Sequence, residues 1–295
     1  MKTMILLVGE QPVPNLLPVH RIRPDAVVLV YTPLTKQRAQ NLKKVIAVDQ
    51  CYMCEVDPYT VPITQKQLEQ FLQEKCSDHT LVFNVTGGTK PMAFAAFSIA
   101  QKHNAPLVYL QTQEEQSLLY EYEVDNCSLR LKAGTPISLP PSVTIKDYLT
   151  LYLGDYQVAG FENEFEKAVY NALQPYVDEI LAGVRKGGAL QIDLVIRCGN
   201  RVGIAEVKTG GKAGKKEGID QLNTAGGREF LGIYTKKFLI VDRPWDTLSN
   251  LRELAEARSI TVVEVPSYGK RKEISEEDQR VLVERIQQVL RCSRD

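Results

Sequence analysis

Short apolar runs, separated by helix-like stretches, dominate the first part of the chain. Continuous runs of Val, Leu and Ile predict strands that are buried on both faces of a parallel sheet. These runs are Ile5–Val8, Ala26–Tyr31, Leu81–Val85 and Leu107–Leu110. Between them, apolar positions recur at helical spacing in Thr35–Val48, Thr64–Lys75 and Lys90–His103. Alternating strands and helices of this size predict a doubly wound α/β fold of Rossmann type.

The order of elements changes in the second half. Residues 117–132 alternate between apolar and polar and predict a hairpin, and glycines and prolines at 134–145 predict a boundary. We therefore expect one domain over residues 1–140 and a second α/β domain over 145–295. The second domain is predicted to contain helices at Glu162–Leu173, around Asp220–Arg228 and from Ser275 to about Arg291, and strands at Gln191–Arg197, Arg201–Val207, Lys237–Val241 and Ile260–Val265.

Bulk composition favours a globular protein. The chain has 295 residues, of which 44% are hydrophobic and 24% charged. No apolar run approaches the roughly 20 residues needed to cross a bilayer, and Met1–Gly9 lacks a cleavage pattern, so we expect a cytoplasmic protein without membrane contact. Six scattered cysteines argue against a disulfide scaffold. Cys51 and Cys54 have the spacing of half a zinc site or of a redox pair, and we expect them to be structural.

Positive charge is concentrated locally, although the net charge is zero. One run of basic residues contains Glu206 as its only acid: Arg197, Arg201, Lys208, Lys212, Lys215 and Lys216. We expect this run to bind a phosphate backbone, and a solvated loop is the alternative. Three aromatic residues nearby are candidates for stacking on bases, namely Phe230, Tyr234 and Trp245.

Two carboxylates are predicted to meet on adjacent strands. A short turn at 198–200 joins the strands that carry Asp193 and Glu206, so counting outward from the turn places the two side by side. Such a pair can hold Mg²⁺ or Mn²⁺, with the carbonyl of Val207 as a further ligand. Lys208 is two positions after Glu206 and points to the same face. The pattern predicts metal-assisted hydrolysis of a phosphodiester.

The sequence Ile192-Asp193, followed by Glu206-Val207-Lys208, resembles the PD-(D/E)xK restriction-endonuclease-like superfamily, with Ile192 in place of the usual proline. The resemblance implies a restriction-endonuclease-like fold for the second domain. It also implies a supporting glutamate on the preceding helix, for which Glu166 is preferred over Glu162. Gln221 resembles the polar residue that the superfamily places near the site. The alternative is a surface Glu–Lys pair without function.

The histidines exclude some competing chemistries in the second domain. All three, His20, His79 and His103, lie in the first half. The second half therefore cannot host a histidine-dependent ribonuclease or a Ser-His-Asp triad.

A glycine-containing loop joins a predicted buried strand to a helix in the first domain. Its sequence is Asn84-Val85-Thr86-Gly87-Gly88-Thr89-Lys90-Pro91-Met92. Two glycines allow close approach of the backbone to a ligand, and amides at a helix amino terminus bind phosphate. The segment matches neither dinucleotide nor P-loop fingerprints. A structural turn would explain the glycines but not the flanking threonines and lysine.

This loop, together with the segment Val8–Pro18, resembles the ligand loops of CARF (CRISPR-associated Rossmann fold) domains. The order of the two domains is also that of CARF nucleases that carry a PD-(D/E)xK domain. The resemblance implies a homodimer that binds a cyclic oligoadenylate, usually the four-membered ring, cyclic tetra-adenylate. The ligand contacts that it implies are Gln11, Asn15, Thr86, Gly87, Gly88, Thr89 and Lys90.

The two resemblances together imply a ligand-activated, metal-dependent nuclease of type III CRISPR antiviral defence. Its expected substrate is DNA, cut or nicked, with RNA as a further candidate. Two alternatives remain open at this stage. The second domain would bind nucleic acid without cutting it, so that the protein is a sensor or regulator, or the first domain would itself cleave the cyclic ligand.

Overall fold

The chain folds into two compact α/β units. The computed structural model describes residues 1–113, 116–125, 128–246 and 249–292. The amino-terminal unit comprises Met1–Val143 with Thr150–Tyr152, and the carboxyl-terminal unit comprises Thr144–Leu149 with Leu153–Asp295. Within the described ranges, none of the helices has the length and apolar character that a membrane span requires. The predicted fold class, a Rossmann-like unit followed by a second α/β unit, is confirmed.

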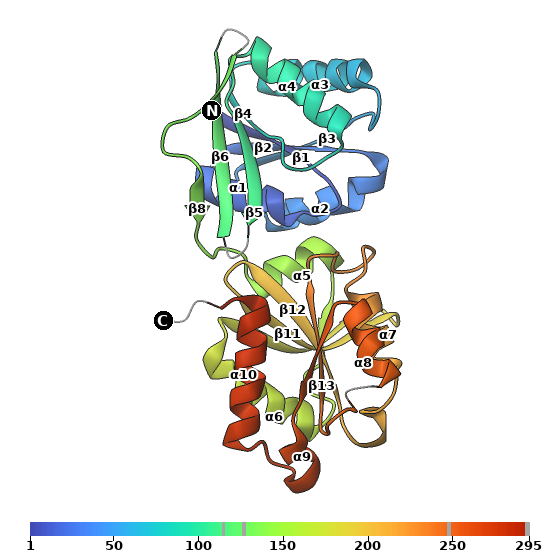
Figure 1. The fold of residues 1–295 in the computed structure, drawn as a ribbon. Coiled ribbons are helices and arrows are strands. Elements are labelled where there is room, and N and C mark those ends of the chain that lie inside the picture. Colours follow the sequence, from blue (N-terminus) through green and yellow to red (C-terminus); the bar gives the residue numbers. More distant parts are fainter. Residues whose placement is uncertain (114–115, 126–127, 247–248, 293–295) are drawn as a thin grey trace. The chain divides into compact units, whose positions relative to one another are not determined.

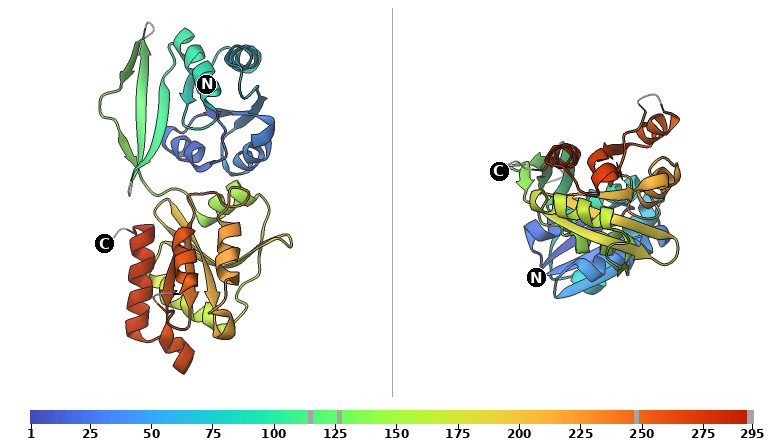
Figure 2. Two further views of the ribbon diagram at one scale, coloured as in Figure 1. Left: turned by 45° about the vertical axis from the view of Figure 1, so that its right-hand side comes forward. Right: turned by 90° about the horizontal axis from the view of Figure 1, so that it is seen from below.

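The sheet of the amino-terminal unit has the order β3-β2-β1-β4-β5-β6-β7, with β8 paired to β6. Strands β1 to β5 run parallel, and β6 turns back antiparallel to β5. Figure 2 shows β5 and β6, in green, as long strands side by side. The bounds are β1 (Lys2–Leu7), β2 (Ala26–Tyr31), β3 (Gln50–Glu55), β4 (Thr80–Asn84), β5 (Leu107–Gln113), β6 (Gln116–Asp125), β7 (Ser128–Leu131) and β8 (Ile137–Leu139).

Helices cover both faces of this sheet, α3 and α4 on one and α1 and α2 on the other (Figure 1). Their bounds are α1 (Val13–Ile22), α2 (Lys36–Val45), α3 (Val61–Cys76) and α4 (Lys90–Lys102). The expectation of a loop through Pro18 is wrong, because α1 begins at Val13. Pro14 lies in the first turn of α1, where a backbone N–H group would have no hydrogen-bond partner within the helix, so its absence costs nothing. Pro18 lies inside the helix. Strand β3, whose apolar signal is weak, is not among the strands that the sequence predicts.

The strand order reverses between β1 and β4, and the loops that follow these strands therefore flank a crevice. The loops touch through glycines. A Cβ atom at Gly87 would lie 2.2 Å from the backbone oxygen of Leu7, and one at Gly9 would lie 3.1 Å from the amide nitrogen of Gly88. Gly88 itself has a φ of +73°, which favours glycine. The two loops that are predicted to contact a ligand therefore lie at the carboxyl ends of the strands, where open α/β sheets bind ligands.

The carboxyl-terminal unit is built on a mixed sheet with the order β14-β13-β12-β11-β10-β9. Strands β9 to β12 are antiparallel, whereas β12, β13 and β14 are parallel. The strand bounds are β9 (Gln157–Val158), β10 (Glu179–Lys186), β11 (Leu190–Cys198), β12 (Arg201–Lys208), β13 (Lys236–Val241) and β14 (Ile260–Glu264). The helix bounds are α5 (Ile145–Leu153), α6 (Glu164–Leu173), α7 (Glu217–Ala225), α8 (Asn250–Ala257), α9 (Pro266–Arg271) and α10 (Glu276–Leu290).

Helices α6 and α10 cover one face of this sheet, and α7 and α8 lie on the other (Figure 1). The core beneath α6 and α10 includes Leu194, Ile196, Ala205 and Val207. These residues alternate along β11 and β12 with Asp193, Glu206 and Lys208, so the polar set points to the opposite face. Alternation of the two strands therefore separates the core from the candidate site.

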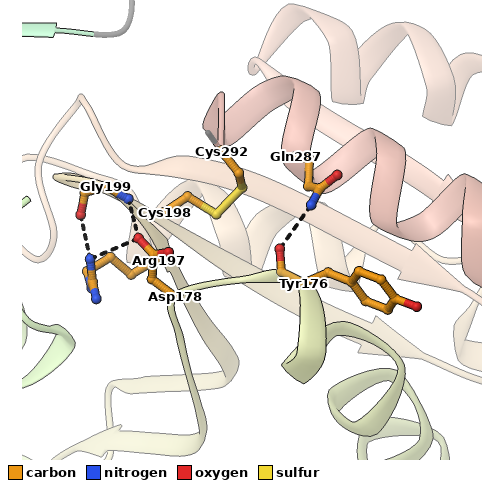
Figure 3. Close-up of a disulfide and its surroundings, with 7 residues drawn as sticks. All are labelled: Tyr176, Asp178, Arg197, Cys198, Gly199, Gln287 and Cys292. Atoms are coloured by element: carbon orange, nitrogen blue, oxygen red, sulfur yellow. Dashed lines mark hydrogen bonds and ion pairs between the residues drawn. A yellow bond between two sulfur atoms is a disulfide. The ribbon is translucent and has the colours of Figure 1, made fainter. Parts of the chain in front are cut away.

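A disulfide joins Cys198, at the end of β11, to Cys292, which follows α10 (Figure 3). The two cysteines are separated by 94 residues in sequence and by 5.0 Å between their Cα atoms. The sequence argues against a disulfide scaffold and does not predict this pair. Only the packing of α10 beside β11 brings them together. Cys51, Cys54 and Cys76 are free, and Cys127 lies outside the described residues.

Removing this disulfide is expected to destabilise the carboxyl-terminal unit by about 2–4 kcal/mol, because a long loop loses its constraint in the unfolded chain. The variant Cys198→Ser/Cys292→Ser would be unfolded in urea and followed by tryptophan fluorescence. The single tryptophan, Trp245, lies in this unit and is buried, so it reports on the unit alone. Cys51→Ser, a free cysteine in the other unit, is the control, and equal midpoints for both variants would contradict the expectation.

Candidate functional site

The candidate catalytic residues lie where β11 and β12 separate. The ladder between the strands runs from Cys198↔Arg201 to Leu194↔Ala205. One position further along this register, Asp193 stands opposite Glu206. There the amide of Val207 donates a 2.8 Å hydrogen bond to Asp193 Oδ2. The expected side-by-side placement of the two carboxylates is what this register produces.

Lys208 completes the cluster from the same strand as Glu206. Its Nζ atom forms an ion pair with Glu206 Oε1, as alternation along β12 predicts. The side chains of Glu206 and Lys208 are 3% and 13% exposed, so the pair is not the solvated surface pair that was the alternative. Val207 points into the core, as expected.

Burial and nearby charges shift the pKa values of Asp193, Glu206 and Lys208. Burial, reinforced by the charge of Asp193, raises the pKa of Glu206 to about 8. Burial also raises the pKa of Asp193. Burial alone would lower the pKa of Lys208, but the charge of Glu206 and the hydrogen bond to it outweigh this and raise the pKa. Ionisation of both carboxyl groups would therefore place more negative charge in the cluster than its lysine balances.

The variant Glu206→Gln is expected to be more stable than the native chain at pH 8.5 in a chelator, and equally stable near pH 5. The folded-state pKa of Glu206 is raised to about 8, so the folded chain keeps a proton that the unfolded chain releases above its lower pKa. Native stability therefore falls as pH rises through this window, by on the order of a few kcal/mol, whereas glutamine does not titrate. The measurement is the melting temperature as a function of pH.

Glu284→Gln, which changes an exposed glutamate on α10, is the control for that measurement. The charged groups that act on Glu206 are Asp193 on β11, Lys208 on its own strand and Glu166 on α6. A stability gain that is the same at pH 5 and pH 8.5 would show that titration of this cluster is not its cause.

The donor set fits a hard divalent cation. Asp193 and Glu206 offer carboxylate oxygens, the ligands that Mg²⁺ and Mn²⁺ prefer, and their uncompensated charge is what a cation would neutralise. Within the described ranges, no three His, Cys, Asp or Glu side chains are grouped so that they could hold a metal ion. The set is therefore two carboxylates, with the Val207 carbonyl as the predicted further ligand.

Glu166 lies near this pair but is not grouped with it. It sits in the first turn of α6, 2% exposed, and Oε2 accepts a 2.8 Å hydrogen bond from the amide of Glu162. Its Oε1 accepts from Asn163 Nδ2. Burial raises its pKa to about 6, and Asp193 and Lys208 also act on it. Glu162, the second candidate for the supporting glutamate, instead forms an ion pair with Arg185 and accepts a hydrogen bond from Gln191.

Gln221 lies on the helix that packs against the catalytic strand. A Cβ atom at Gly218, one turn earlier on α7, would lie 3.4 Å from Lys208 Cγ, so this face of α7 covers the lysine. Gln221 Oε1 is buried and accepts no hydrogen bond from any described residue. Burying a polar atom without a partner is costly, which makes Gln221 a candidate to bind a water molecule or substrate at the site.

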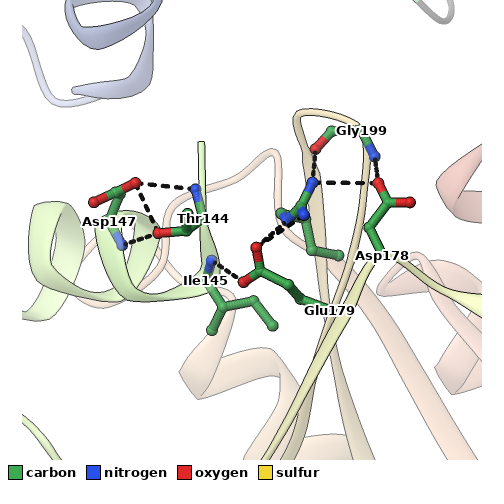
Figure 4. A network of polar contacts seen from close by, with 7 residues as sticks. Thr144, Ile145, Asp147, Asp178, Glu179 and Gly199 are labelled. Atoms are coloured by element: carbon green, nitrogen blue, oxygen red, sulfur yellow. Dashed lines mark hydrogen bonds and ion pairs between the residues drawn. The ribbon is translucent and has the colours of Figure 1, made fainter. Parts of the chain in front are cut away.

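The predicted basic run is reduced by the fold. Arg197 is paired with Asp178 and Glu179 (Figure 4), so it is not available to bind a phosphate backbone, and Lys208 belongs to the buried carboxylate cluster. Lys212, Lys215 and Lys216 remain exposed in the loop after β12. Trp245 is 8% exposed and donates to the carbonyl of Ala213, which contradicts its expected role in stacking, whereas Tyr234 is exposed.

Asp242 is a residue near the site that the sequence analysis missed. It is 3% exposed at the end of β13, and its Oδ2 accepts hydrogen bonds from Thr209 Oγ1 and from the amide of Gly210, the latter at 2.9 Å. It therefore fixes the start of the basic loop. The signal that could have found it is an acidic residue directly after a buried strand.

The glycine loop of the amino-terminal unit is held by its own threonines. Thr86 Oγ1 donates to Asn84 Oδ1 at 2.6 Å and accepts from the amide of Leu110 at 2.8 Å. Thr89 caps α4 by accepting from the amide of Met92, and its hydroxyl donates to Pro58 O at 2.6 Å. Both hydroxyls therefore shape the loop. Gly88 and Lys90 are exposed.

Two predicted ligand contacts occupy unexpected places. Asn15 lies in α1, fully buried, where its Nδ2 donates to Leu7 O and its Oδ1 accepts from Asn84. The prediction that Asn15 faces a ligand is corrected by this burial, since both ends of its amide group join β1 to β4. Gln11 lies in the loop after β1, and its Oε1 accepts a 2.6 Å hydrogen bond from Tyr152 Oη.

Comparison with protein families decides the nature of this unit. Residues 3–148 match the family model of the Card1 CARF domain. The amino-terminal unit is a CARF domain. The match covers the glycine loop and the loop after β1, the two segments that carried the resemblance. No curated protein matches the sequence.

Solved structures extend the likeness beyond the CARF domain. Can2 from Sulfobacillus thermosulfidooxidans, in complex with cyclic tetra-adenylate, has a TM-score of 0.68 at 18% identity, covering 98% of this chain and 97% of that chain. Protein VC1899 from Vibrio cholerae has a TM-score of 0.70 at 12% identity, covering 98% of each chain. A type III CRISPR defence DNA nuclease activated by cyclic oligoadenylate has a TM-score of 0.50 at 15% identity, covering 82% of this chain and 45% of that chain. These likenesses show a shared fold across both units.

Proposed function

We propose that this protein is a metal-dependent nuclease of type III CRISPR defence that a cyclic oligoadenylate activates. The observation that carries the proposal is the buried cluster of Asp193, Glu206 and Lys208 at the fork of β11 and β12. In a chain whose other unit is a CARF domain, such a cluster favours a regulated phosphodiesterase. The fold shared with Can2, which was solved with cyclic tetra-adenylate, supports the same assignment.

In the proposed mechanism, each residue of the cluster has a separate task. Asp193 and Glu206, with the carbonyl of Val207, would hold Mg²⁺ or Mn²⁺, which supplies a Lewis acid for the scissile phosphate and lowers the pKa of bound water. Lys208 stabilises negative charge that develops on the phosphate. Glu166, whose pKa is raised to about 6, accepts or returns a proton near neutral pH. Gln221 orients a water molecule or substrate through its unpartnered oxygen.

The ligand of the CARF domain is proposed to be cyclic tetra-adenylate. Amides of the glycine loop and of the first turn of α4 are the proposed donors to its phosphates, and the exposed Lys90 adds positive charge. Gly87 and Gly88 admit the ring closely, Gln11 contacts it from the other loop, and Thr86 and Thr89 hold the shape of the site. Asn15 holds the two loops together through its hydrogen bonds with Leu7 and Asn84.

A homodimer is proposed because a ring with repeated phosphates suits two symmetry-related loops. Four large apolar side chains stay exposed on the segments that follow β2 and β3 and in the first turns of α3 and α4, namely Leu34, Tyr59, Ile63 and Phe94. Exposed apolar side chains can contribute to an interaction surface.

The deciding experiment incubates the protein with a supercoiled plasmid, labelled single-stranded DNA and labelled RNA. Each reaction contains Mg²⁺, Mn²⁺ or a chelator, with or without cyclic tetra-adenylate. We expect cleavage of DNA, and of RNA to a smaller extent, that needs both metal and ligand. Glu206→Ala should abolish cleavage, whereas Glu284→Ala, an exposed glutamate on α10, should not.

Each contrary outcome points to a different function. Ligand-stimulated binding of nucleic acid without cleavage would replace the proposal with a sensor or regulator. Cleavage of the ring itself to a linear product would assign the chemistry to the CARF domain. Cleavage at the same rate with and without cyclic tetra-adenylate would show that the ligand does not regulate the nuclease.

A further inference from the structure

The loop between β12 and α7, residues 209–216, combines positive charge with a flexible composition. Its three lysines are exposed, namely Lys212, Lys215 and Lys216. Its glycines lie in open space, because a Cβ atom at Gly210, Gly211 or Gly214 would meet nothing within 4 Å. Glycine loses more conformational entropy on ordering than any other residue. A loop of this composition therefore keeps one shape only where other segments hold it.

Asp242, which follows β13, holds the start of this loop. Its Oδ2 accepts hydrogen bonds from Thr209 Oγ1 at 2.5 Å and from the amide of Gly210 at 2.9 Å. Its own amide donates to Lys208 O at 3.3 Å. Burial alone would raise the pKa of Asp242, but the two accepted hydrogen bonds and the charge of Arg243 outweigh it and lower the pKa. The carboxylate is therefore ionised, and hydrogen bonds to a charged acceptor are stronger than neutral ones.

Trp245 holds the loop at a second point. Its indole Nε1 donates a 2.7 Å hydrogen bond to the carbonyl of Ala213, and both residues are buried. The backbone of Trp245 is fixed in turn, because its amide donates to Glu264 Oε1 at 2.9 Å and the same oxygen pairs with Arg252. Glu264 ends β14 and Arg252 lies on α8. The second anchor is therefore attached to two regular elements of the carboxyl-terminal unit.

The two anchors lie on either side of one lysine. Asp242 holds the start of the loop, Trp245 holds the residue after Lys212, and Lys212 lies between them. The amide of Lys215 donates to Lys212 O at 3.2 Å. Within the described part of the chain, Lys212 and Lys215 form no ion pair, whereas Lys216 has an acidic partner on α7. Two buried side chains therefore hold a loop with two uncompensated positive charges.

These charges are close along the chain to the catalytic strand. Lys212 comes four residues after Lys208, and four residues span at most about 13 Å. Successive phosphates of one strand advance by roughly 3.4 Å along the axis of a duplex. Lys212 can therefore contact a phosphate only a few nucleotides from the one that the cluster would cut. A lysine that binds a phosphate fixes the position of the nucleic acid without reading its bases.

We propose that Asp242 and Trp245 are positioning residues that hold Lys212 and Lys215 where these lysines bind the backbone phosphates beside the cut. The proposal rests on the proposed function and names the substrate-binding loop of its site. A loop that is ordered before the substrate arrives spares binding the entropic cost of ordering it. The same loop without its anchors would carry the same charge and bind more weakly.

Lys212→Gln/Lys215→Gln removes both charges and leaves both anchors. At saturating metal and cyclic tetra-adenylate, we expect the KM for a labelled single-stranded DNA to rise roughly tenfold while kcat stays within about twofold, because contacts away from the reacting phosphate supply uniform binding. In a chelator, the slope of log affinity against log salt should fall by about 0.7 for each lysine. The matched control is Lys146→Gln/Lys236→Gln, which removes two exposed lysines elsewhere in the unit and should change neither quantity.

Two further variants loosen one anchor each and keep every lysine. Trp245→Phe removes the N–H donor to Ala213 and keeps an aromatic ring, and Asp242→Asn removes the charge from the accepted hydrogen bonds. We expect each to raise KM about fivefold with kcat nearly unchanged, since binding must then order the loop. Melting temperatures check that the variants fold, and the two anchors are tested independently of each other.

Combining the changes distinguishes positioning of the lysines from a general effect on the unit. If Trp245 acts through Lys212 and Lys215, then Trp245→Phe should raise KM by less than twofold in the Lys212→Gln/Lys215→Gln background. Effects that are independent would instead multiply.

The outcomes separate this proposal from the function on which it rests. A native protein that neither binds nor cuts DNA or RNA, with metal and cyclic tetra-adenylate present, would overturn the proposed function and this proposal with it. If the native protein cuts but the lysine variant keeps the KM and salt slope of its control, the function stands and the lysine contacts are overturned. Anchor variants that lower kcat without raising KM, or whose effects multiply with those of the lysines, would overturn the positioning role.

Discussion

Replacing Lys208 with methionine is expected to reduce cleavage by about 10²–10³-fold, the loss seen when one electrostatic group at a reacting centre is removed. The ammonium group is nearly buried and contacts Glu206, so its charge acts with little screening by solvent. Methionine keeps most of the length and apolar volume of the side chain. The measurement is the single-turnover rate of DNA cleavage at saturating metal and cyclic tetra-adenylate.

Lys208→Arg is the companion variant. It keeps the charge, but its planar fork is larger and is not interchangeable with an ammonium group in a tight space, so we expect a partial loss. Ligand affinity should be unchanged in both variants, since the ligand loop lies in the CARF domain. A methionine variant that cuts within twofold of the native rate would exclude Lys208 from the chemistry.

Replacing Gly87 with alanine is expected to remove activation while leaving the nuclease cluster intact. A Cβ atom there would meet the backbone oxygen of Leu7 at 2.2 Å, and backbone cannot give way as a flexible side chain can. Overpacking of this kind costs about 1–3 kcal/mol, which corresponds to a loss of roughly 5- to 150-fold in ligand affinity. Titration calorimetry with cyclic tetra-adenylate measures the effect.

Gly188→Ala is the matched control, because a Cβ atom at Gly188 meets nothing within 4 Å. It should bind the ligand and be activated like the native protein. Cleavage without ligand should be the same in the native chain and in Gly87→Ala. If Gly87→Ala binds the ring within twofold of the native affinity, the loop after β4 is not the ligand site.

Much of the fold follows from local pattern. The runs at Ala26–Tyr31 and Lys237–Val241 are strands, and the helices expected at Lys90–His103 and after Ser275 are present with ends shifted by a residue or so. Helix α1 was missed because two prolines dominate its sequence. Strand β10 (Glu179–Lys186) was missed because its mixed polar and apolar residues give no clear period.

Some residues of the candidate site could be predicted from local sequence, whereas others depend on tertiary packing. Asp193, Glu206 and Lys208 were found because a short turn and an alternation of two fix their register, which are local properties. The place of Glu166 near the carboxylate pair depends on the packing of α6 against the sheet. Asp242 was missed because its partners, Thr209 and Gly210, lie on a neighbouring strand's loop. Arg197 was assigned to phosphate binding because its acids, Asp178 and Glu179, are distant in sequence.

The sequence by itself determined the two α/β units, the fork that carries the carboxylates and the glycine loop after β4, because turn residues and hydrophobic periodicity act over a few positions. Tertiary structure alone decided the Cys198–Cys292 disulfide and the burial of Asn15 and Trp245. Each of these depends on which distant segments pack together. Burial then sets the charge state of the cluster, because removing Glu206 from water beside Asp193 is what raises its pKa to about 8.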